Sequence, residues 1–380
     1  MLYAHPHRLL VVAALVTILA VADVDAATFH VAMSGDDNAA GTAAGTAASP
    51  WRTIQKAVAV ARAGDTIAVH GGVYTGHVIF RHSGQPDKPI VLKSAPGQRP
   101  VFDGEGKGRI ELKSQEGWRK PIGWIIVEGF EIRNGWDGIK FYNAHHIVLR
   151  DNHIHSNLNQ GILGNGHHVR IEGNIIARNG FKSDNERSNL EHGIYCTGTD
   201  FRIVNNVIHS NKAYGIQVAG YPYHPENHPG PEFADARRWL ISNNTLVLNQ
   251  NRAGIVIWQS RATDCVIQNN IFYKNSVSLR TGAVQGVDFV SAGGGHVIRN
   301  NLFFAPGRKS IGDAEAFSAG DNIEQEDPRF VEPEQFDFRL QPRSPAINAA
   351  APENAPATDL TGTTRPQGRG IDIGAYEQPE

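Results

Sequence analysis

Short apolar stretches recur along the chain between residues 123 and 304, and within them apolar and polar positions alternate. Ile139 and Phe141 form one such apolar pair, and Ile216 and Val218 form another. An alternation of this kind has the period of a half-buried β-strand. The strands that carry it begin with Gly-Ile pairs, whose glycines are Gly138, Gly161, Gly193, Gly215 and Gly254.

A second set of short apolar stretches ends at an asparagine. Neighbouring asparagines of this set are 22 residues apart between Asn152 and Asn174 and 38 apart between Asn206 and Asn244. At about 3.3 Å per extended residue, such a unit has room for two or three short strands and their turns. We therefore predict an all-β solenoid whose stacked coils bury a continuous core. The asparagines expected to form a ladder at one turn are Asn152, Asn174, Asn206, Asn244, Asn270 and Asn301.

The segments that flank the repeats indicate the kind of solenoid. Residues 49–57 read Ser-Pro-Trp-Arg-Thr-Ile-Gln-Lys-Ala, residues 64–67 read Gly-Asp-Thr-Ile, and residues 372–377 read Asp-Ile-Gly-Ala-Tyr-Glu. With the repeat, these segments resemble the secreted right-handed parallel β-helix proteins of the pectate-lyase-like superfamily. The resemblance implies a right-handed parallel β-helix with an N-terminal capping helix. It implies action on polysaccharides only broadly, because that superfamily contains lyases, hydrolases, epimerases and non-catalytic members.

The chain divides into a leader and one predicted domain. Residues 1–26 combine a basic start with an apolar run that is shorter than the roughly 20 residues of a membrane span, which is typical of a signal peptide. We expect residues 27–380 to form a single β-helix domain. Its parts are an N-terminal cap at about 28–65, core repeats at about 66–305 and an irregular C-terminal segment at about 306–380. The protein should be secreted or periplasmic, with no membrane insertion.

Charge and cysteine content narrow the class of partner. The chain has 36 Lys and Arg against 38 Asp and Glu, which argues against a general nucleic-acid binder. Its two cysteines, Cys196 and Cys265, fall on different coils, so we expect buried thiols and no disulfide. The expected partner is a polysaccharide substrate, bound by a monomer.

Two longer intervals between repeats locate the predicted site. Residues 181–190 are inserted before the Gly193 strand, and residues 221–237 follow the Gly215 strand. Because both insertions flank the same two strands, we predict a walled groove there. The side chains expected to bind sugar in and beside this groove are Asp137, Tyr214, Gln217, Tyr221, Tyr223 and Trp258.

Cleavage by β-elimination is the first of three chemistries that fit this groove. A lyase acting on uronic-acid polymers neutralises the sugar carboxylate, removes the proton on carbon-5 and protonates the departing oxygen. Arg187, Lys140 or a bound Ca²⁺ could neutralise the carboxylate, and His192 or Lys140 could remove the proton. Tyr195 or Tyr214 could protonate the leaving oxygen. His192 is the best single candidate, because it lies where the two insertions converge.

The other two chemistries are hydrolysis or epimerisation on the same wall and binding without catalysis. A glycoside hydrolase needs two carboxylates about 5–10 Å apart. A binding protein needs only the aromatic side chains of the groove, which can stack on sugar rings. We predict a lyase, with His192, Lys140, Tyr195, Arg187 and Glu191 as the catalytic candidates. No coil carries a cluster of aspartates, so the sequence leaves a need for calcium open. The carboxylates available for hydrolysis are Asp137, Asp184, Glu186 and Glu191.

Overall fold

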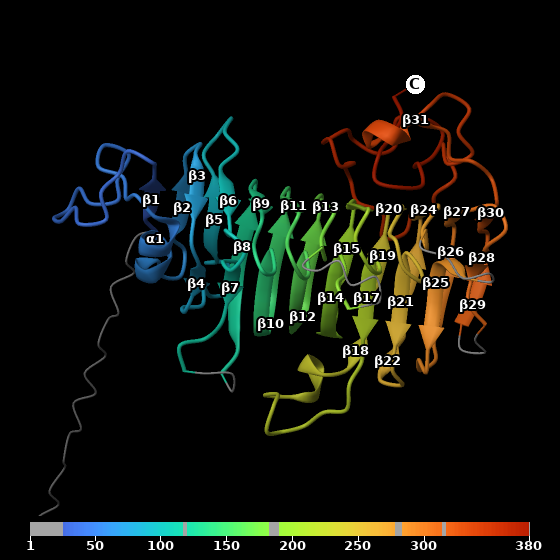
Figure 1. The fold of residues 1–380 in the computed structure, drawn as a ribbon, viewed down its shortest axis with the longest axis horizontal. Coiled ribbons are helices and arrows are strands. Elements are labelled where there is room, and N and C mark those ends of the chain that lie inside the picture. Colours follow the sequence, from blue (N-terminus) through green and yellow to red (C-terminus); the bar gives the residue numbers. More distant parts are fainter. Residues whose placement is uncertain (1–25, 117–119, 182–189, 278–282, 314–316, 380) are drawn as a thin grey trace, which may run out of the picture.

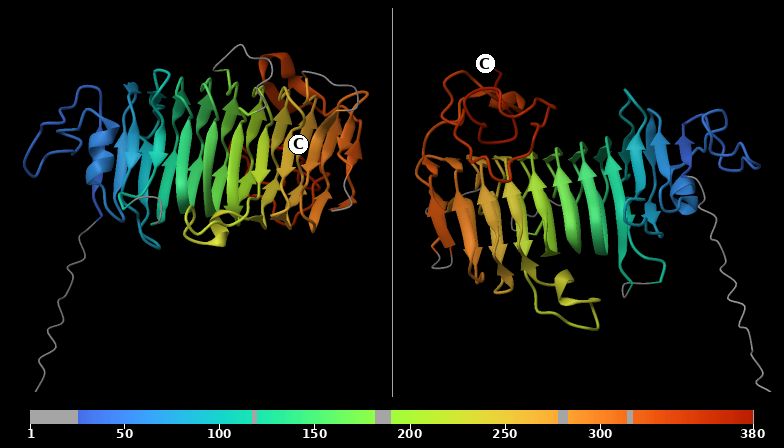
Figure 2. Two further views of the ribbon diagram at one scale, coloured as in Figure 1. Left: turned by 60° about the horizontal axis from the view of Figure 1, so that its bottom comes forward. Right: turned by 180° about the vertical axis from the view of Figure 1, so that it is seen from behind.

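The computed structural model shows an elongated stack of coils, in which each coil contributes parallel strands to three walls (Figures 1 and 2). It describes residues 26–116, 120–181, 190–277, 283–313 and 317–379. The coil is that of a right-handed parallel β-helix, so the predicted fold class is confirmed. Within the described residues, no helix is long and apolar enough to cross a membrane.

The first wall contains the Gly-Ile strands, and the second wall directly follows it in each coil. The strands β10 (Ile139–Arg150) and β12 (Ile162–Glu172) run through both walls. The first wall further contains β4 (Val78–Phe80), β7 (Ile110–Leu112), β14 (Ile194–Thr199), β17 (Ile216–Ala219), β21 (Ile255–Trp258), β25 (Val284–Val290) and β28 (Lys309–Ile311). The second wall further contains β1 (Thr28–Val31), β2 (Thr66–Val69), β5 (Ile90–Ser94), β8 (Ile122–Glu128), β15 (Arg202–Val204), β19 (Leu240–Ser242), β23 (Val266–Gln268), β26 (His296–Arg299) and β29 (Phe317–Gly320), with β18 (Ala236–Arg237) and β22 (Ala262–Thr263) at the corner between the two walls.

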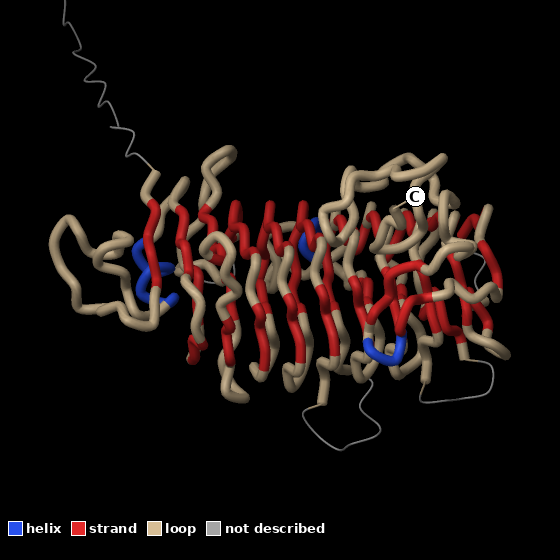
Figure 3. The backbone as a smooth tube through the Cα atoms, turned by 90° about the horizontal axis from the view of Figure 1, so that it is seen from above, coloured by secondary structure: helices blue, strands red, loops and turns tan. Residues whose placement is uncertain are grey.

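The third wall is a separate parallel sheet of short strands that closes each coil (Figure 3). Its inward side chains, among them Ile154, Ile176 and Ile208, are fully buried and belong to the same core as the other walls. The strands are β3 (Val73–Thr75), β6 (Val101–Asp103), β9 (Glu131–Arg133), β11 (His153–His155), β13 (Ile175–Ala177), β16 (Val207–His209), β20 (Thr245–Val247), β24 (Ile271–Tyr273), β27 (Leu302–Phe304) and β30 (Ile323–Glu324).

The Gly-Ile strands stack in register, as predicted. Ile139 pairs with Ile162, which pairs with Ile194, and the series continues through Ile216 and Ile255. The glycine before each isoleucine is required by close approach of the next coil. At Gly161, an added Cβ would lie 2.6 Å from the carbonyl oxygen of the next glycine in the stack, a distance that real Cβ atoms do not adopt.

Two asparagine ladders hold the turns. In the predicted ladder, Asn206 accepts hydrogen bonds from the backbone N–H and the side-chain amide of Asn174, and its own amide donates to Asn244. The second ladder was not predicted. It runs through the turn from the third wall to the first, and it repeats the same bonds, for example from Asn179 to Asn211 at 3.1 and 3.0 Å. Its members are Asn157, Asn179, Asn211, Asn249 and Asn275.

Segments outside the repeats cover the N-terminal end of the stack and the third wall of its late coils. At the N-terminal end, α1 (Ile54–Val60) begins at Thr53, whose hydroxyl accepts the N–H of Lys56, and its apolar side packs on β1, β2 and β4. Residues 328–376 turn back over the outer surface of the third wall from β16 to β27. This segment includes the antiparallel pair β31 (Phe330–Glu332) and β32 (Asp337–Leu340), with the turn η2 (Pro333–Gln335) between them.

Both cysteines are free and buried, which confirms the prediction for them. Burial raises the pKa of the Cys265 thiol to about 12 and also raises that of Cys196. Neither thiol is therefore set up for reaction.

Candidate functional site

The outer surface of the first wall carries two parallel rows of side chains. Because strand residues alternate in direction, every second residue of each strand points away from the core. Register places Lys140 beside Glu111 on one neighbouring strand and beside Leu163 on the other. The first row contains Glu111, Lys140, Leu163, Tyr195, Gln217, Val256 and Asp288, and the second contains Lys113, Tyr142, Asn165, Thr197, Ala219 and Trp258.

His192 does not lie on the accessible surface, and its predicted catalytic role is wrong. The side chain is fully buried, with 0% exposure. Its Nδ1 accepts the backbone N–H of Tyr214 at 3.2 Å, and the two rings stack with centroids 4.3 Å apart. Burial lowers the pKa of His192 to about 3. The ring therefore fills a turn between two coils as a neutral group and cannot reach a substrate.

Several other candidates from the central coils are also covered. Tyr214, Gln217 and Glu191 are 4%, 6% and 1% exposed. Val256, which points outward beside Gln217, is fully buried in a small apolar cluster with Tyr214 and Val284. An outward direction on a strand is not the same as exposure when other segments cover the strand. Asp184, Glu186 and Arg187 fall outside the described residues.

Tyr195 and Tyr221 join the central coils to the second insertion. Their hydroxyl groups are hydrogen-bonded to each other, and both side chains are half-buried. Burial, followed by this bond, raises the pKa of Tyr195, so its hydroxyl keeps its proton at neutral pH. Tyr223 and Trp258 are also half-buried, Trp258 at the edge of the apolar cluster.

The second insertion folds back over the coils that precede it. It contains η1 (Pro231–Phe233), which packs on β12 and β14, and the ring of Phe233 meets that of His167 edge-on at 5.0 Å. At its end, Asp235 is bound by Arg261 at 2.7 and 3.1 Å. Figure 1 shows this segment projecting beyond the lower edge of the coils. It therefore borders the lower side of the first wall.

The charged groups gather on the N-terminal coils instead. Glu111 accepts a bond from Arg109 at 3.2 Å and lies 2.8 Å from the Nε2 of His77. Arg109 Nη1 lies 3.6 Å from Asp137 Oδ2, and Lys140 Nζ lies 4.0 Å from the same oxygen. These side chains form a continuous ionic network across three coils.

Asp137 is the buried centre of this network. One of its oxygens accepts bonds from the side chain of Asn159 at 2.7 Å and from the backbone of Gln160. The other oxygen is also buried and accepts no hydrogen bond from the described residues, although the two cations face it. A fully buried carboxylate of this kind is expected to hold nearby cations in place. Asp137 was predicted as a sugar-binding residue, but it is too deeply buried to touch a ligand directly.

A lysine pair flanks one half-buried tyrosine, Tyr142, next to the network. Lys140 Nζ lies 5.1 Å and Lys113 Nζ lies 5.5 Å from the centre of the Tyr142 ring. Arg81 follows β4 in the same row as Lys113, and its side chain is exposed. The sequence repeat marked Lys140 but missed its neighbours, because β4 and β7 lie in coils that lack the Gly-Ile signature. We call Arg81, Arg109, Lys113, Lys140 and Tyr142 the basic patch.

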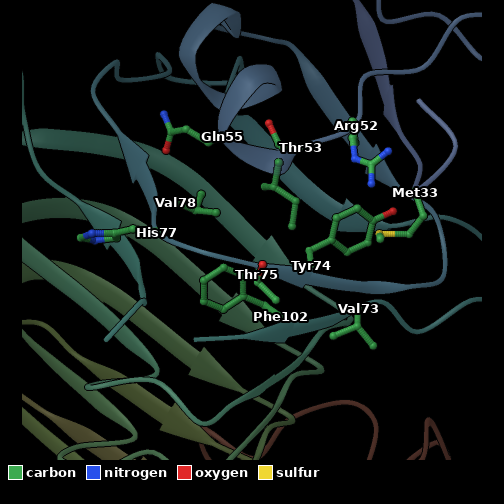
Figure 4. Close-up of a pocket in the computed structure, with 11 residues that line it drawn as sticks. Met33, Arg52, Thr53, Gln55, Val73, Tyr74, Thr75, His77, Val78 and Phe102 are labelled. Atoms are coloured by element: carbon green, nitrogen blue, oxygen red, sulfur yellow. The ribbon is translucent and has the colours of Figure 1, made fainter. Parts of the chain in front are cut away.

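The basic patch adjoins a cavity at the N-terminal cap. The cavity has a volume of about 340 Å³ and lies between the start of α1 and the strands β3 and β4 (Figure 4). Gln55 at its rim accepts the backbone N–H of Ile79 at 2.7 Å. His77 also lines the cavity and connects it to Glu111, so the ionic network extends to this end of the first wall. Desolvation lowers the pKa of His77 despite the nearby glutamate.

The described part of the chain contains no group of three or more His, Cys, Asp or Glu side chains that could hold a metal ion. Asp137 and Glu111, the carboxylates of the network, are already occupied by arginine, lysine and histidine. These residues therefore do not fit a calcium site, and no step below uses one.

Comparison with known proteins places this geometry in a family. A model of the Pel9A-like right-handed β-helix region matches residues 29–312. The chain belongs to this family. The crystal structure of pectate lyase Pel9A superposes with a TM-score of 0.60 at 17% identity, and the match covers 93% of this chain and 96% of that one.

Two relatives are similar over shorter stretches. Pectate lyase PEL9 of Emericella nidulans is 39% identical over 82 residues, which is 21% of this chain and 19% of the relative. The uncharacterized protein YwoF of Bacillus subtilis is 26% identical over 132 residues, which is 32% of this chain and 28% of the relative. The matches span less than a third of either relative. They support a distant similarity to polysaccharide lyases.

Proposed function

We propose that this protein is a polysaccharide lyase that cleaves a uronic-acid-containing polymer by β-elimination at the basic patch. The observation that carries the proposal is the pair Lys113 and Lys140, which flank the half-buried Tyr142 beside the network of Arg109 and Asp137. Family membership supports the same reaction class. The polymer would lie across the outer surface of the first wall, where the strands present one residue per coil about 4.8 Å apart.

The basic patch contains the three kinds of group that the reaction requires. Lys113 and Arg81 would neutralise the uronate carboxylate, which makes the proton on carbon-5 removable. Lys140, a cation beside Asp137 in the resting protein, would first release a proton to solvent and then take the proton from carbon-5, and the electron pair would form the double bond between carbons 4 and 5. The bond from carbon 4 to the glycosidic oxygen breaks, and the Tyr142 hydroxyl gives its proton to that oxygen. Asp137 and Arg109 act by positioning Lys140.

The decisive measurement is the unsaturated uronate end, detected by its ultraviolet absorbance across a panel of polygalacturonate, alginate and neutral polymers. We expect absorbance to rise with at least one uronate polymer and with no neutral one. New reducing ends without that absorbance would indicate hydrolysis. Binding without either product would indicate a carbohydrate-binding protein, and an altered ratio of uronate epimers would indicate epimerisation.

We also propose that the protein is exported, because residues 1–26 have the pattern of a signal peptide. Such a location would give it access to a polymer too large to enter a cell. The expected result is a mature chain that begins at Ala27, measured by N-terminal sequencing of protein recovered from outside the cytoplasm. A chain that retains Met1 in the cytoplasm would contradict it.

A further inference from the structure

A second groove lies at the corner between the third wall and the first. It has a volume of about 420 Å³, within the range of about 300–1,000 Å³ that is typical of small-molecule sites. The C-terminal segment supplies one side of it through Phe336, and the turns of four successive coils supply the rest. We call this the Phe336 groove. Its lining residues are Ser156, Asn157, Leu158, Arg178, Phe181, Ser210, Gln250 and Phe336.

The ring of Phe336 is held in place although 43% of it is exposed. It stacks on His209 with centroids 4.6 Å apart, and the neighbouring Phe338 anchors the segment in the buried cluster over the third wall. The backbone of Phe336 has φ 63°, a conformation that a bulky residue adopts only when its surroundings impose it. An exposed aromatic face that is fixed in this way binds a ligand with little loss of side-chain entropy.

The groove is positively charged. The Arg178 guanidinium lies 5.7 Å from the centre of the Phe336 ring, and Lys212 Nζ lies 5.5 Å from that of Phe181, which is also exposed. No carboxylate belongs to the lining. Two cations beside two aromatic faces, with no carboxylate among the lining residues, favour a ligand that has both a flat apolar face and a negative charge.

We propose that the Phe336 groove binds a segment of an anionic polysaccharide, with a uronate ring on Phe336 and its carboxylate on Arg178. The choice of polymer rests on the proposed function, but binding at the groove does not require catalysis there. The groove lining shares no residue with the basic patch. It would therefore hold another stretch of the polymer and keep the enzyme on its substrate, which raises the effective concentration at the basic patch.

The test is a calorimetric titration with tetragalacturonate. It uses the chain in which Lys113→Ala and Lys140→Ala together remove the basic patch, so that turnover and binding at the patch are absent. We expect one remaining site. Arg178→Gln or Phe336→Ala should weaken it at least about tenfold, while Arg178→Lys, which keeps the charge but loses the planar fork, should have an intermediate effect.

Two controls keep the result specific. Val331→Ala removes an exposed apolar side chain of the same segment outside the groove lining, so affinity should not change. The fully methyl-esterified tetramer has the same rings without charge and should bind about tenfold more weakly. Thermal unfolding of each variant shows whether it is folded.

Three outcomes would overturn the proposal: no binding to the double-alanine chain, binding unaffected by both groove substitutions, or equal affinity for the charged and esterified tetramers. The proposed function fails separately, through the absence of the unsaturated product with the unaltered protein.

Discussion

The N-terminal and C-terminal coils share one core but differ in what they show to the outside. Inside the third wall, Ile132 and Ile154 at one end and Phe272 and Phe303 at the other are equally buried. Outside, the early coils are polar and open, whereas the late coils are apolar and covered by residues 328–376. The early outward residues include Asp103, Glu131, Arg133, His153 and His155, and the late ones include Val207, Val247, Ile271, Tyr273 and Leu302.

This difference distinguishes outer surfaces that are open to a ligand from outer surfaces that pack against another segment of the chain. Inward positions are fixed by the stacking of coils, so they are similar throughout. Outward positions are free to vary, and their polarity decides whether another segment covers them. The basic patch lies on the open coils. Of the candidates that proved to be buried, His192, Tyr214, Gln217 and Glu191 lie on the central coils, and Asp137 lies beneath the basic patch. The comparison predicts that substitutions in the early coils affect activity and those in the late coils affect stability.

The largest expected effect is on turnover, from Lys140→Ala. Loss of the group that takes the carbon-5 proton should lower kcat about a thousandfold, in the range of general-base contributions. Some stability should be lost as well, because Lys140 faces the buried carboxylate of Asp137, so kcat is compared for the folded protein. The matched control is Arg202→Ala, which removes an exposed cation from the second wall. Initial rates of unsaturated product formation measure both. Equal losses in the two variants would break the link between the open early coils and catalysis.

In the C-terminal segment that covers the late coils, the substitution Arg365→Met is expected to lower stability and leave turnover unchanged. Arg365 is buried with Glu377 at 3.1 Å and also donates to the carbonyl groups of Asp372 and Gly374 at 2.9 Å. Removing it leaves the glutamate charged and buried, which typically costs about 3–5 kcal/mol. Chemical denaturation measures the loss. In the folded fraction, kcat should be unchanged. The double variant Arg365→Met/Glu377→Leu should recover part of the stability, since it removes the stranded charge.

The asparagine ladder allows a comparison of its middle with its end. Asn206→Ala removes a side chain that accepts two bonds from Asn174 and donates one to Asn244, all of them fully buried. Buried groups left without partners cost roughly 1–3 kcal/mol each, so we expect a loss of about 3 kcal/mol. Asn322→Ala removes the last, partly exposed rung, and should cost about 1 kcal/mol. Chemical denaturation measures the free energy of unfolding of both variants. Equal losses would contradict the idea that burial sets the contribution of each rung.

The sequence predicted the parts of this molecule that repeat. The Gly-Ile strands and the first asparagine ladder follow directly from register, since one coil constrains the next. The second ladder carries the same residue at the same spacing, and it could have been found by extending the search five positions beyond Asn152 to Asn157. The basic patch was harder to find, because Lys113 and Arg81 lie in coils without the Gly-Ile signature. Strand alternation gives no information about His192, because it lies in the turn before β14, and that is why its burial between two coils was missed.

The smallest expected effects concern the pH dependence of stability, which tests the burial of three histidines. Burial lowers the pKa of His192 and His209 to about 3 and that of His153 to about 4. Below about 6.5 the unfolded chain takes up protons at these positions while the folded chain does not. The free energy of unfolding should therefore fall as pH drops from about 6.5 towards 4, and it should be flat above 7. Denaturation series at several pH values measure this slope.

His192→Gln separates this structural role from a catalytic one. Glutamine can still accept the N–H of Tyr214, and it cannot take up a proton in the unfolded state. The slope of stability against pH should therefore become shallower by about one proton near pH 5. Turnover at neutral pH should stay within about twofold of the original. A loss of turnover as large as that of Lys140→Ala, in a variant that remains folded, would return the active site to the central coils.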